Sequence, residues 1–141
     1  MKKPELIDCI QNIHYYLVQF VEKELRGFKL KQLKYSHYEI IRLLHLNNKM
    51  RLKDISQSIA KHKSTVTALI KKLEKLELIE LTPSKRDARV TFVSLSKEGK
   101  KMKGLINSIE QKLLINLHMQ LSKPEQDKLI GSLKKLLPTN S

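Results

Sequence analysis

The most constraining feature of this sequence is a pair of short helical patterns joined by only three residues. Apolar residues four and three positions apart predict a short helix over 54–60 and a longer one over 64–76. The two helices are separated by three residues, Lys61, His62 and Lys63, so the connection between them has to be a tight turn. Two helices connected in this way are typical of a helix-turn-helix unit.

The hydrophobic period changes after the second of these helices. Residues 78–82 and 89–95 are rich in β-branched and aromatic side chains, and they predict two strands. Residues 83–88 between them begin with Pro83 and predict a turn. Residues 50–53 are expected to form a further short extended piece. The combination predicts a helix-turn-helix followed by a β-hairpin with a basic tip, which is a winged helix.

Amphipathic helices are expected on both sides of this lobe. Their stripes lie within 5–26 and 97–137, and a further helix is expected after Ser36, with Glu39 completing a capping box. One long helix is expected from Ser96 to about Met119, and a last one after Ser122. The predicted fold class is therefore mainly α with a small β-hairpin (α+β), as one domain over 1–141 with a winged lobe at 35–96.

The charge balance points to a polyanionic partner. Lys and Arg number 28 against 14 Asp and Glu, which gives a net charge of +14. Residues 47–103 hold fifteen of the basic and six of the acidic residues, so +9 falls on the predicted winged lobe. Nucleic acid is the first expectation and an anionic membrane surface the second.

Several other classes of protein do not fit the sequence. No apolar run approaches the length of about 20 residues that a membrane span needs, and no secretion signal is expected at the N-terminus, so we expect a cytoplasmic protein. Cys9 is the single cysteine, which excludes an intramolecular disulfide and a cysteine-based zinc finger. No nucleophile–base set or phosphate loop stands out, so we expect no enzyme, and the scattered histidines predict no metal or other cofactor.

The helix over 64–76 is the candidate for the major groove of double-stranded DNA. Its candidate contact residues are Lys63, Ser64, Thr65, Thr67, Ala68, Lys71 and Lys72. In the hairpin the candidates are Lys85, Arg86, Asp87 and Arg89, with arginine entering the minor groove. Asp87 stands two residues before Arg89 and can hold its guanidinium, although the same spacing also fits an ordinary turn salt bridge.

Two segments resemble the MarR family of bacterial winged-helix regulators: STVTALIKKLEKLELI at 64–79 and DARVTFVSLSKEG at 87–99. The second matches the hallmark pattern of that family through Asp87, Arg89, Val93, Leu95, Ser96 and Gly99. The resemblance implies a homodimer, usually a repressor, that binds a pseudo-palindromic operator, with 5–26 and 97–137 forming the dimerisation region. Apolar stripes richer than one small domain needs to bury support that region independently.

The sequence departs from the family pattern at three positions. Glu77 stands where glycine is common, which costs roughly 1 kcal/mol if its backbone is left-handed. Ala68 stands where arginine is frequent, and His62 where a better N-cap is usual.

Regulation by a small molecule is also implied by the resemblance. An anionic aromatic effector would bind a cleft between the winged lobe and the dimer helices, with candidate residues Tyr15, Tyr35, His37, Tyr38 and Arg42, each of which also fits ordinary packing. Some relatives sense peroxide through a cysteine in the first helix, which makes Cys9 a redox candidate. A lone cysteine on an amphipathic helix is more often a small buried hydrophobe, and no basic residue shares its helical turn.

Two further alternatives stay open at this point. The winged lobe could belong to a sequence-neutral architectural or RNA-binding protein, or its groove face could bind a protein partner. A thiol-based regulator acting through Cys9 is a third form of the DNA-binding hypothesis.

Overall fold

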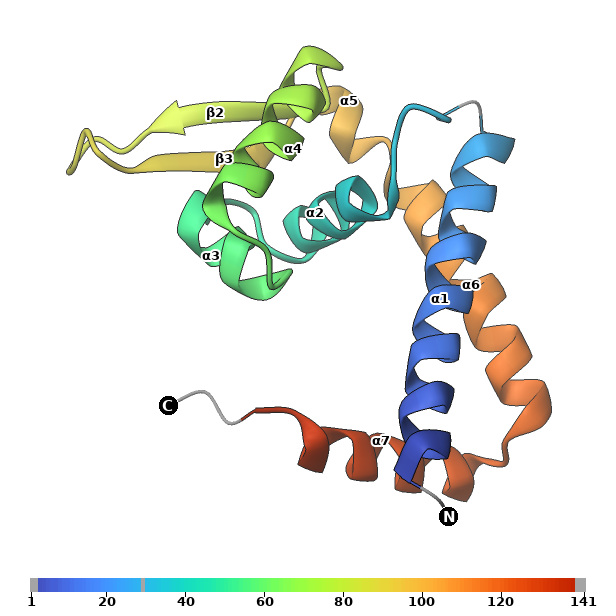
Figure 1. Ribbon diagram of the computed structural model, residues 1–141. Coiled ribbons are helices and arrows are strands. Elements are labelled where there is room, and N and C mark those ends of the chain that lie inside the picture. Colours follow the sequence, from blue (N-terminus) through green and yellow to red (C-terminus); the bar gives the residue numbers. More distant parts are fainter. Residues whose placement is uncertain (1–2, 29, 139–141) are drawn as a thin grey trace. The chain divides into compact units, whose positions relative to one another are not determined.

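The computed structural model describes residues 3–28 and 30–138 (Figure 1). It divides into two compact units, residues 1–106 and 107–141, and each is described by itself. The elements are α1 (Lys3–Gly27), α2 (Tyr35–Leu46), β1 (Met50–Arg51), α3 (Leu52–Ser58), α4 (Lys63–Lys75), β2 (Ile79–Pro83), β3 (Thr91–Leu95), α5 (Lys97–Lys100), α6 (Lys103–Gln120) and α7 (Lys123–Leu136). The predicted fold class, mainly helical with a small antiparallel hairpin, is confirmed.

The hairpin belongs to a three-stranded antiparallel sheet with the order β1-β3-β2. Thr82 pairs with Phe92, and Met50 pairs with Val93 from the other side, so the expected extended piece is the edge strand β1. Because side chains alternate along a strand, Val93 and Leu95 are buried, whereas Phe92 is only half-buried on the opposite face. One face of the sheet therefore closes the core, and the other is left open.

The core of the first unit is built by the inner faces of α2, α3 and α4 together with the sheet. Its fully buried side chains include Ile40, Ile41, Ile55, Val66 and Leu73, each expected to contribute about 1.5–3 kcal/mol of burial free energy. α4 contributes Val66, Ile70 and Leu73, which share one face at helical spacing. The opposite face of α4 consequently points to solvent.

A compact junction connects the end of α4 to the start of α5. The Ser96 backbone N–H donates to the Leu78 carbonyl oxygen at 3.0 Å, and its hydroxyl donates to the Glu77 carbonyl oxygen at 2.6 Å. The Gly99 N–H donates to the Ser96 hydroxyl oxygen at 3.0 Å, and a Cβ on Gly99 would overlap the Leu78 carbonyl oxygen. Ser96 and Gly99 therefore tie the base of the hairpin to the turn that follows α4.

The predicted start of α2 was wrong. Ser36 is not its cap: the helix begins at Tyr35, and the Lys34 backbone N–H donates to Nδ1 of His37 at 2.9 Å. Glu22 of α1 provides a second cap, because its Oε2 accepts the Tyr35 N–H at 2.9 Å. The His37 imidazole and the Glu22 carboxylate thus accept the N–H groups of Lys34 and Tyr35 at the start of the helix, in place of the capping box expected at Ser36.

The single long helix predicted after Ser96 is also interrupted. α5 ends at Lys100, and α6 begins at Lys103. The N–H groups of Lys101 and Met102 bond to carbonyl oxygens only three residues back, those of Glu98 and Gly99. The backbone therefore forms one turn with the tighter 3₁₀ pattern of hydrogen bonds. The apolar spacing of the sequence continues through this turn, so it gave no sign of the interruption.

In the second unit, the cap predicted at Ser122 is confirmed. Its hydroxyl oxygen accepts the Glu125 N–H at 3.3 Å, and the Glu125 carboxylate accepts the Ser122 N–H at 3.1 Å. These bonds hold the pKa of the Glu125 carboxyl below its usual range. Gln126 is buried, and its amide donates to the Leu121 carbonyl oxygen at 2.9 Å.

Large apolar side chains remain exposed in both units. In α1 they include Leu6, Ile7, Ile10 and Ile13. In the second unit they include Leu114, Ile115, Met119, Leu129, Ile130, Leu133, Leu136 and Leu137. Large exposed apolar patches are uncommon in a monomer, and side chains three or four positions apart on a helix share one face.

Candidate nucleic-acid interface

The solvent face of α4 brings together most of the recognition-helix residues predicted to contact DNA. The helical period places five exposed residues there: Ser64, Thr65, Ala68, Lys71 and Lys72. The first turn of α4 carries no acidic residue. The face combines two hydroxyl groups near its N-terminal end with two cations further along.

Thr67 lies differently from what its position near the helix start suggested. It is half-buried, and its hydroxyl donates to the Lys63 carbonyl oxygen at 2.8 Å. The hydroxyl proton is therefore used inside the helix, which leaves only acceptor capacity for a ligand. Lys63 itself is exposed.

The N-terminus of α4 is suited to an anion. His62 is its N-cap, with an extended backbone, and makes no side-chain hydrogen bond to the first turn. The first backbone N–H groups of a helix lack partners within the helix, and the helix dipole places partial positive charge there. A phosphate oxygen is a natural acceptor at such an end.

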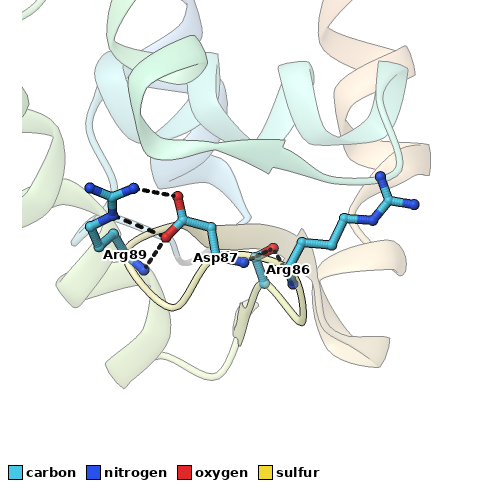
Figure 2. A network of polar contacts seen from close by, with 4 residues as sticks. Arg86, Asp87 and Arg89 are labelled. Atoms are coloured by element: carbon cyan, nitrogen blue, oxygen red, sulfur yellow. Dashed lines mark hydrogen bonds and ion pairs between the residues drawn. The ribbon is translucent and has the colours of Figure 1, made fainter.

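The wing tip holds an arginine in a fixed position (Figure 2). Oδ1 of Asp87 accepts the Arg89 backbone N–H at 3.0 Å and its Nε–H at 3.1 Å, and Oδ2 accepts from Nη2 at 3.3 Å. The Arg89 side-chain bonds, followed by its backbone bond, lower the pKa of the Asp87 carboxyl. The Arg89 side chain is nevertheless 90% exposed, so its guanidinium is positioned and also accessible.

The other basic residues of the tip lie differently. Lys85 and Arg86 are exposed, and Figure 2 shows the Arg86 side chain extending away from Arg89. Ser84 braces the turn, because its hydroxyl oxygen accepts the backbone N–H groups of Arg86 at 3.2 Å and Asp87 at 3.3 Å. The wing thus presents cations in two directions.

Two lysines near these elements have partners that the sequence did not indicate. Nζ of Lys49, in the turn before β1, lies 4.5 Å from the centre of the Phe92 ring. Lys61 is half-buried and stabilises the ionised form of Glu39, whose pKa is nevertheless raised by burial. No spacing rule could have found either pairing, because each joins residues far apart in the sequence.

A cavity of about 370 Å³ lies within the first unit, beside the joint between α3 and α4. Its polar lining includes His14, Glu22, Lys34, Tyr35, Ser36, Glu39 and Lys61. Tyr35, one of the five residues predicted to bind an effector, lines this cavity. Burial raises the pKa of the Tyr35 hydroxyl, and Glu39 adds to this effect.

The remaining effector candidates and Cys9 are spread over different environments. His37 and Tyr38 are buried, with the Tyr35 and Tyr38 rings 5.8 Å apart, whereas Tyr15 and Arg42 are exposed. Cys9 is exposed in α1, so it is not buried as a small hydrophobe within a single copy of the chain.

No helix within residues 3–28 and 30–138 has both the length and the apolar character required to cross a bilayer. The same ranges contain no group of three or more His, Cys, Asp or Glu residues placed to hold a metal ion.

Comparisons with known proteins agree with this geometry. The family model described as MarR family matches residues 33–91. The transcriptional regulator SarZ of Staphylococcus haemolyticus is 25% identical over 122 residues, which cover 86% of this chain and 82% of SarZ.

Two solved structures extend the similarity to almost the whole chain. The MepR–DNA complex of Staphylococcus aureus has a TM-score of 0.82 and 21% identity, covering 96% of both chains. FabT of Streptococcus pneumoniae in complex with DNA has a TM-score of 0.82 and 20% identity, covering 96% of this chain and 94% of that one. Residues 33–91 thus form a MarR-family domain, and the similarity to SarZ, MepR and FabT extends over most of the chain.

Proposed function

We propose that this protein is a dimeric transcriptional regulator that binds a pseudo-palindromic operator in double-stranded DNA. The observation that carries the proposal is the pairing of an exposed, hydroxyl- and lysine-bearing face on α4 with a wing arginine that Asp87 holds in place. The relatives support it, since SarZ is a transcriptional regulator and MepR and FabT are bound to DNA.

Each part of the site has a separate task in this proposal. α4 enters the major groove, where Ser64 and Thr65 reach base edges or phosphates and Lys71 and Lys72 neutralise the backbone. Arg89 enters the minor groove, where the negative potential favours a guanidinium. Because Asp87 fixes the guanidinium in advance, less side-chain entropy is lost on binding.

A homodimer supplies the two recognition helices that a pseudo-palindrome requires. We assign dimerisation to residues 5–26 and 97–137, whose exposed apolar side chains need a partner surface. A second copy of the chain would cover apolar area and add its own basic face. Such a protein acts in the cytoplasm and performs no catalysis.

We further propose that the cavity beside Lys61 is the effector site and that an effector releases the repressor from its operator. A ligand there would contact α1, α2 and the joint that precedes α4. An aromatic acid could place its ring against Tyr35 and its carboxylate near Lys34 or Lys61. If it binds better to a conformer with the wrong spacing of the two α4 helices, it lowers operator affinity.

The primary test is selection of bound sequences from random duplex DNA, followed by anisotropy titrations. The selected site should bind at least about 10³-fold more tightly than random duplex at the same salt concentration. Arg89→Ala should weaken binding and reduce its salt dependence, because one phosphate-region cation is lost. Lys31→Ala, which removes the same charge from an exposed position outside the winged lobe and the proposed dimerisation region, is the matched control and should have little effect.

Three results would overturn the proposal in whole or in part. Equal affinity for selected and random duplex would favour an architectural protein. Preferential binding to RNA at matched salt would favour the RNA-binding alternative. Loss of operator binding after peroxide treatment of the parent, but not of Cys9→Ser, would assign regulation to the thiol instead of the cavity.

A further inference from the structure

One lysine in the joint between α3 and α4 differs from its neighbours in exposure. Residues 60 and 62–65 are all exposed, but Lys61 between them is half-buried. Lys61 lines the cavity of about 370 Å³ beside the joint, together with Glu39 of α2. A basic residue directly before the N-cap of α4 therefore lies against the interior of the unit instead of extending fully into solvent.

The backbone of Lys61 is fixed independently of its side chain. Its N–H donates to the Ser56 carbonyl oxygen at 3.1 Å, and its own carbonyl oxygen accepts the Ser56 hydroxyl. Ala60 before it has a φ of 54°, and the Ala60 N–H donates to the Gln57 carbonyl oxygen at 3.3 Å. Because these bonds involve no atom of the Lys61 side chain, a substitution at this position tests the ammonium group and leaves the turn in place.

The charge of Lys61 acts on Glu39, a half-buried carboxylate. The titratable groups that line the cavity beside Glu39 are His14 and Glu22 of α1, Lys34 and Tyr35 at the start of α2, and Lys61. Arg42, further along α2, adds a charge that acts on Tyr35. Burial raises the pKa of the Glu39 carboxyl, and the charges of Lys61 and then His14 act in the opposite direction. Attraction between Glu39 and Lys61 is screened less here than between exposed groups.

We propose that Glu39 is a positioning residue that limits operator affinity by holding Lys61 inside the joint. Lys61 precedes the N-terminus of α4, which is suited to a DNA phosphate. While the carboxylate attracts the ammonium group inward, this cation contributes little to binding that phosphate. Without the carboxylate, the flexible stem of Lys61 lets the ammonium group extend to the phosphate. The inference rests on the proposed function, because it concerns the same DNA-binding face.

Two other roles for Glu39 make different predictions. If Glu39 only supported the fold, its loss would loosen the joint and weaken DNA binding, whereas release of Lys61 adds a cation and strengthens binding. Removal of any negative charge near DNA also strengthens binding, but that effect acts through space and does not require Lys61. The dependence on Lys61 therefore separates the three explanations.

The test is a double-mutant cycle on the full-length chain with the selected duplex. Glu39→Gln keeps the shape of the side chain and removes its charge, and it should bind at least about threefold more tightly at low salt. Its salt dependence should steepen by about one phosphate contact. Both gains should disappear when Lys61→Gln is added, and Lys61→Gln alone should weaken binding less than about twofold.

Glu74→Gln is the matched control. It removes the same charge from an exposed position of α4, so any gain in affinity comes from weaker repulsion of the DNA. That gain should be unchanged by the addition of Lys61→Gln. Equal coupling of Glu39 and Glu74 to Lys61 would overturn the proposal, and so would weaker binding by a Glu39→Gln variant whose amide NMR spectrum matches that of the parent.

The pH dependence of binding gives a test in which Glu39 itself is retained. If DNA draws Lys61 away from Glu39, the carboxyl is easier to protonate in the complex, and binding takes up a proton. The affinity of the parent should therefore rise as the pH falls through the raised pKa of Glu39, and it should rise less in Lys61→Gln. The histidines contribute to both proteins alike, so equal pH dependence would contradict the proposal.

NMR titration of the Glu39 carboxyl carbon without DNA distinguishes this inference from the proposed function. Lys61→Gln should raise the midpoint of that titration, and an unchanged midpoint would show that Lys61 does not pair with Glu39. If the midpoint rises but the parent has no preference for a selected duplex, the proposed function fails, and the role of Glu39 in operator binding fails with it. If operator binding is specific and the cycle shows no coupling, this inference fails alone.

Discussion

At the scale of single residues, Glu77 occupies a backbone conformation that glycine adopts at lower cost. Its φ is 60°, in the left-handed region, which costs a residue with a Cβ about 1 kcal/mol. The surrounding bonds impose this geometry: its N–H donates to the Glu74 carbonyl oxygen at 2.9 Å, and its own carbonyl oxygen accepts the Ser96 hydroxyl. Glu77→Gly is expected to raise the free energy of unfolding by about 0.5–1 kcal/mol, measured by urea denaturation.

Glu74→Gly is the matched control for this prediction. Glu74 is exposed inside α4, where glycine is a poor helix former, so the same chemical change should lower stability by about 0.5 kcal/mol. If the free energy of unfolding rises in Glu77→Gly and falls in Glu74→Gly, the gain is due to the left-handed backbone at position 77. A loss of stability in Glu77→Gly would contradict the assignment.

His37 makes stability depend on pH. It is buried, and its Nδ1 accepts the Lys34 N–H at the start of α2, so the native state requires the unprotonated ring nitrogen. Burial, followed by the charge of Lys72, lowers the pKa of this imidazole. Above about pH 6.5 the ring is neutral in both the folded and unfolded chain. As the pH falls below this value, the unfolded chain binds a proton that the native state resists, and stability declines.

Urea denaturation between pH 8 and pH 5 measures this effect. His37→Gln retains an acceptor for the Lys34 N–H but cannot be protonated, so its stability should fall less steeply over the same range. Lys72→Gln removes a positive charge that lowers the pKa of this imidazole and should reduce the slope in part. His45 contributes in the same direction, since burial lowers its pKa too, and some slope should persist in His37→Gln. If the stability of His37→Gln fell as steeply with pH as that of the parent, the role of His37 would be refuted.

At the scale of elements, Gly99 decides how closely α5 approaches the turn after α4. A Cβ at this position would overlap the Leu78 carbonyl oxygen, which also accepts the Ser96 N–H. The obstacle is backbone, so it cannot rotate away, and overpacking of this kind costs about 1–3 kcal/mol. Gly99→Ala is expected to lower the free energy of unfolding by about that amount in urea denaturation.

Gly104 provides the comparison, because it lies in α6 and a Cβ there would have no neighbour within 4 Å. Gly104→Ala should raise stability by about 0.5–1 kcal/mol, since alanine is the better helix former. If both variants were stabilised, the close approach at Gly99 would not be a constraint on this fold.

The elements themselves were largely predictable from the sequence, because amphipathic spacing and β-branched runs report local burial. α4 was predicted at 64–76 and spans Lys63–Lys75, and the strand predicted at 89–95 spans Thr91–Leu95. The interruption between α5 and α6 was not predictable, since the apolar stripe continues through it. The start of α2 was misplaced because its caps come from a histidine and from Glu22 of another helix.

The candidate site divides in the same way. The contact between Asp87 and Arg89 follows from residues two apart, so local geometry was enough to anticipate it. The placement of Lys49 over Phe92 and the approach of Lys61 to Glu39 depend on tertiary packing. Sequence patterns carry no signal for such pairs, and one of them, Lys61 with Glu39, lines the cavity beside the joint between α3 and α4.

At the scale of the whole molecule, the positive charge opposes dimerisation, whereas the exposed apolar side chains favour it. The net charge of +14 opposes association between identical chains, and the screening length at physiological salt is only about 8 Å. The basic excess is concentrated in residues 47–103, away in sequence from most of the exposed apolar side chains of α1 and α7. A dimer formed through the apolar helices therefore does not need to bring the two most basic segments together.

α7 provides the sharpest test of the dimer. Leu129, Leu133 and Leu136 recur at helical spacing and are 41–63% exposed. Leu133→Glu places a charge in the middle of this stripe, where burial against a second copy would be strongly unfavourable. The parent should sediment at twice 16.5 kDa at micromolar concentration, and Leu133→Glu should shift toward the single-chain mass.

Leu46→Glu is the matched control, because Leu46 is 68% exposed at the end of α2 and lies outside the proposed dimerisation region. It should leave the dimer intact. The Leu133→Glu monomer should also lose most of its advantage for a full operator over a half-site, because only the dimer engages both halves at once. A parent that sediments as a single chain, or a Leu133→Glu variant as dimeric as Leu46→Glu, would show that this face of α7 does not form the interface.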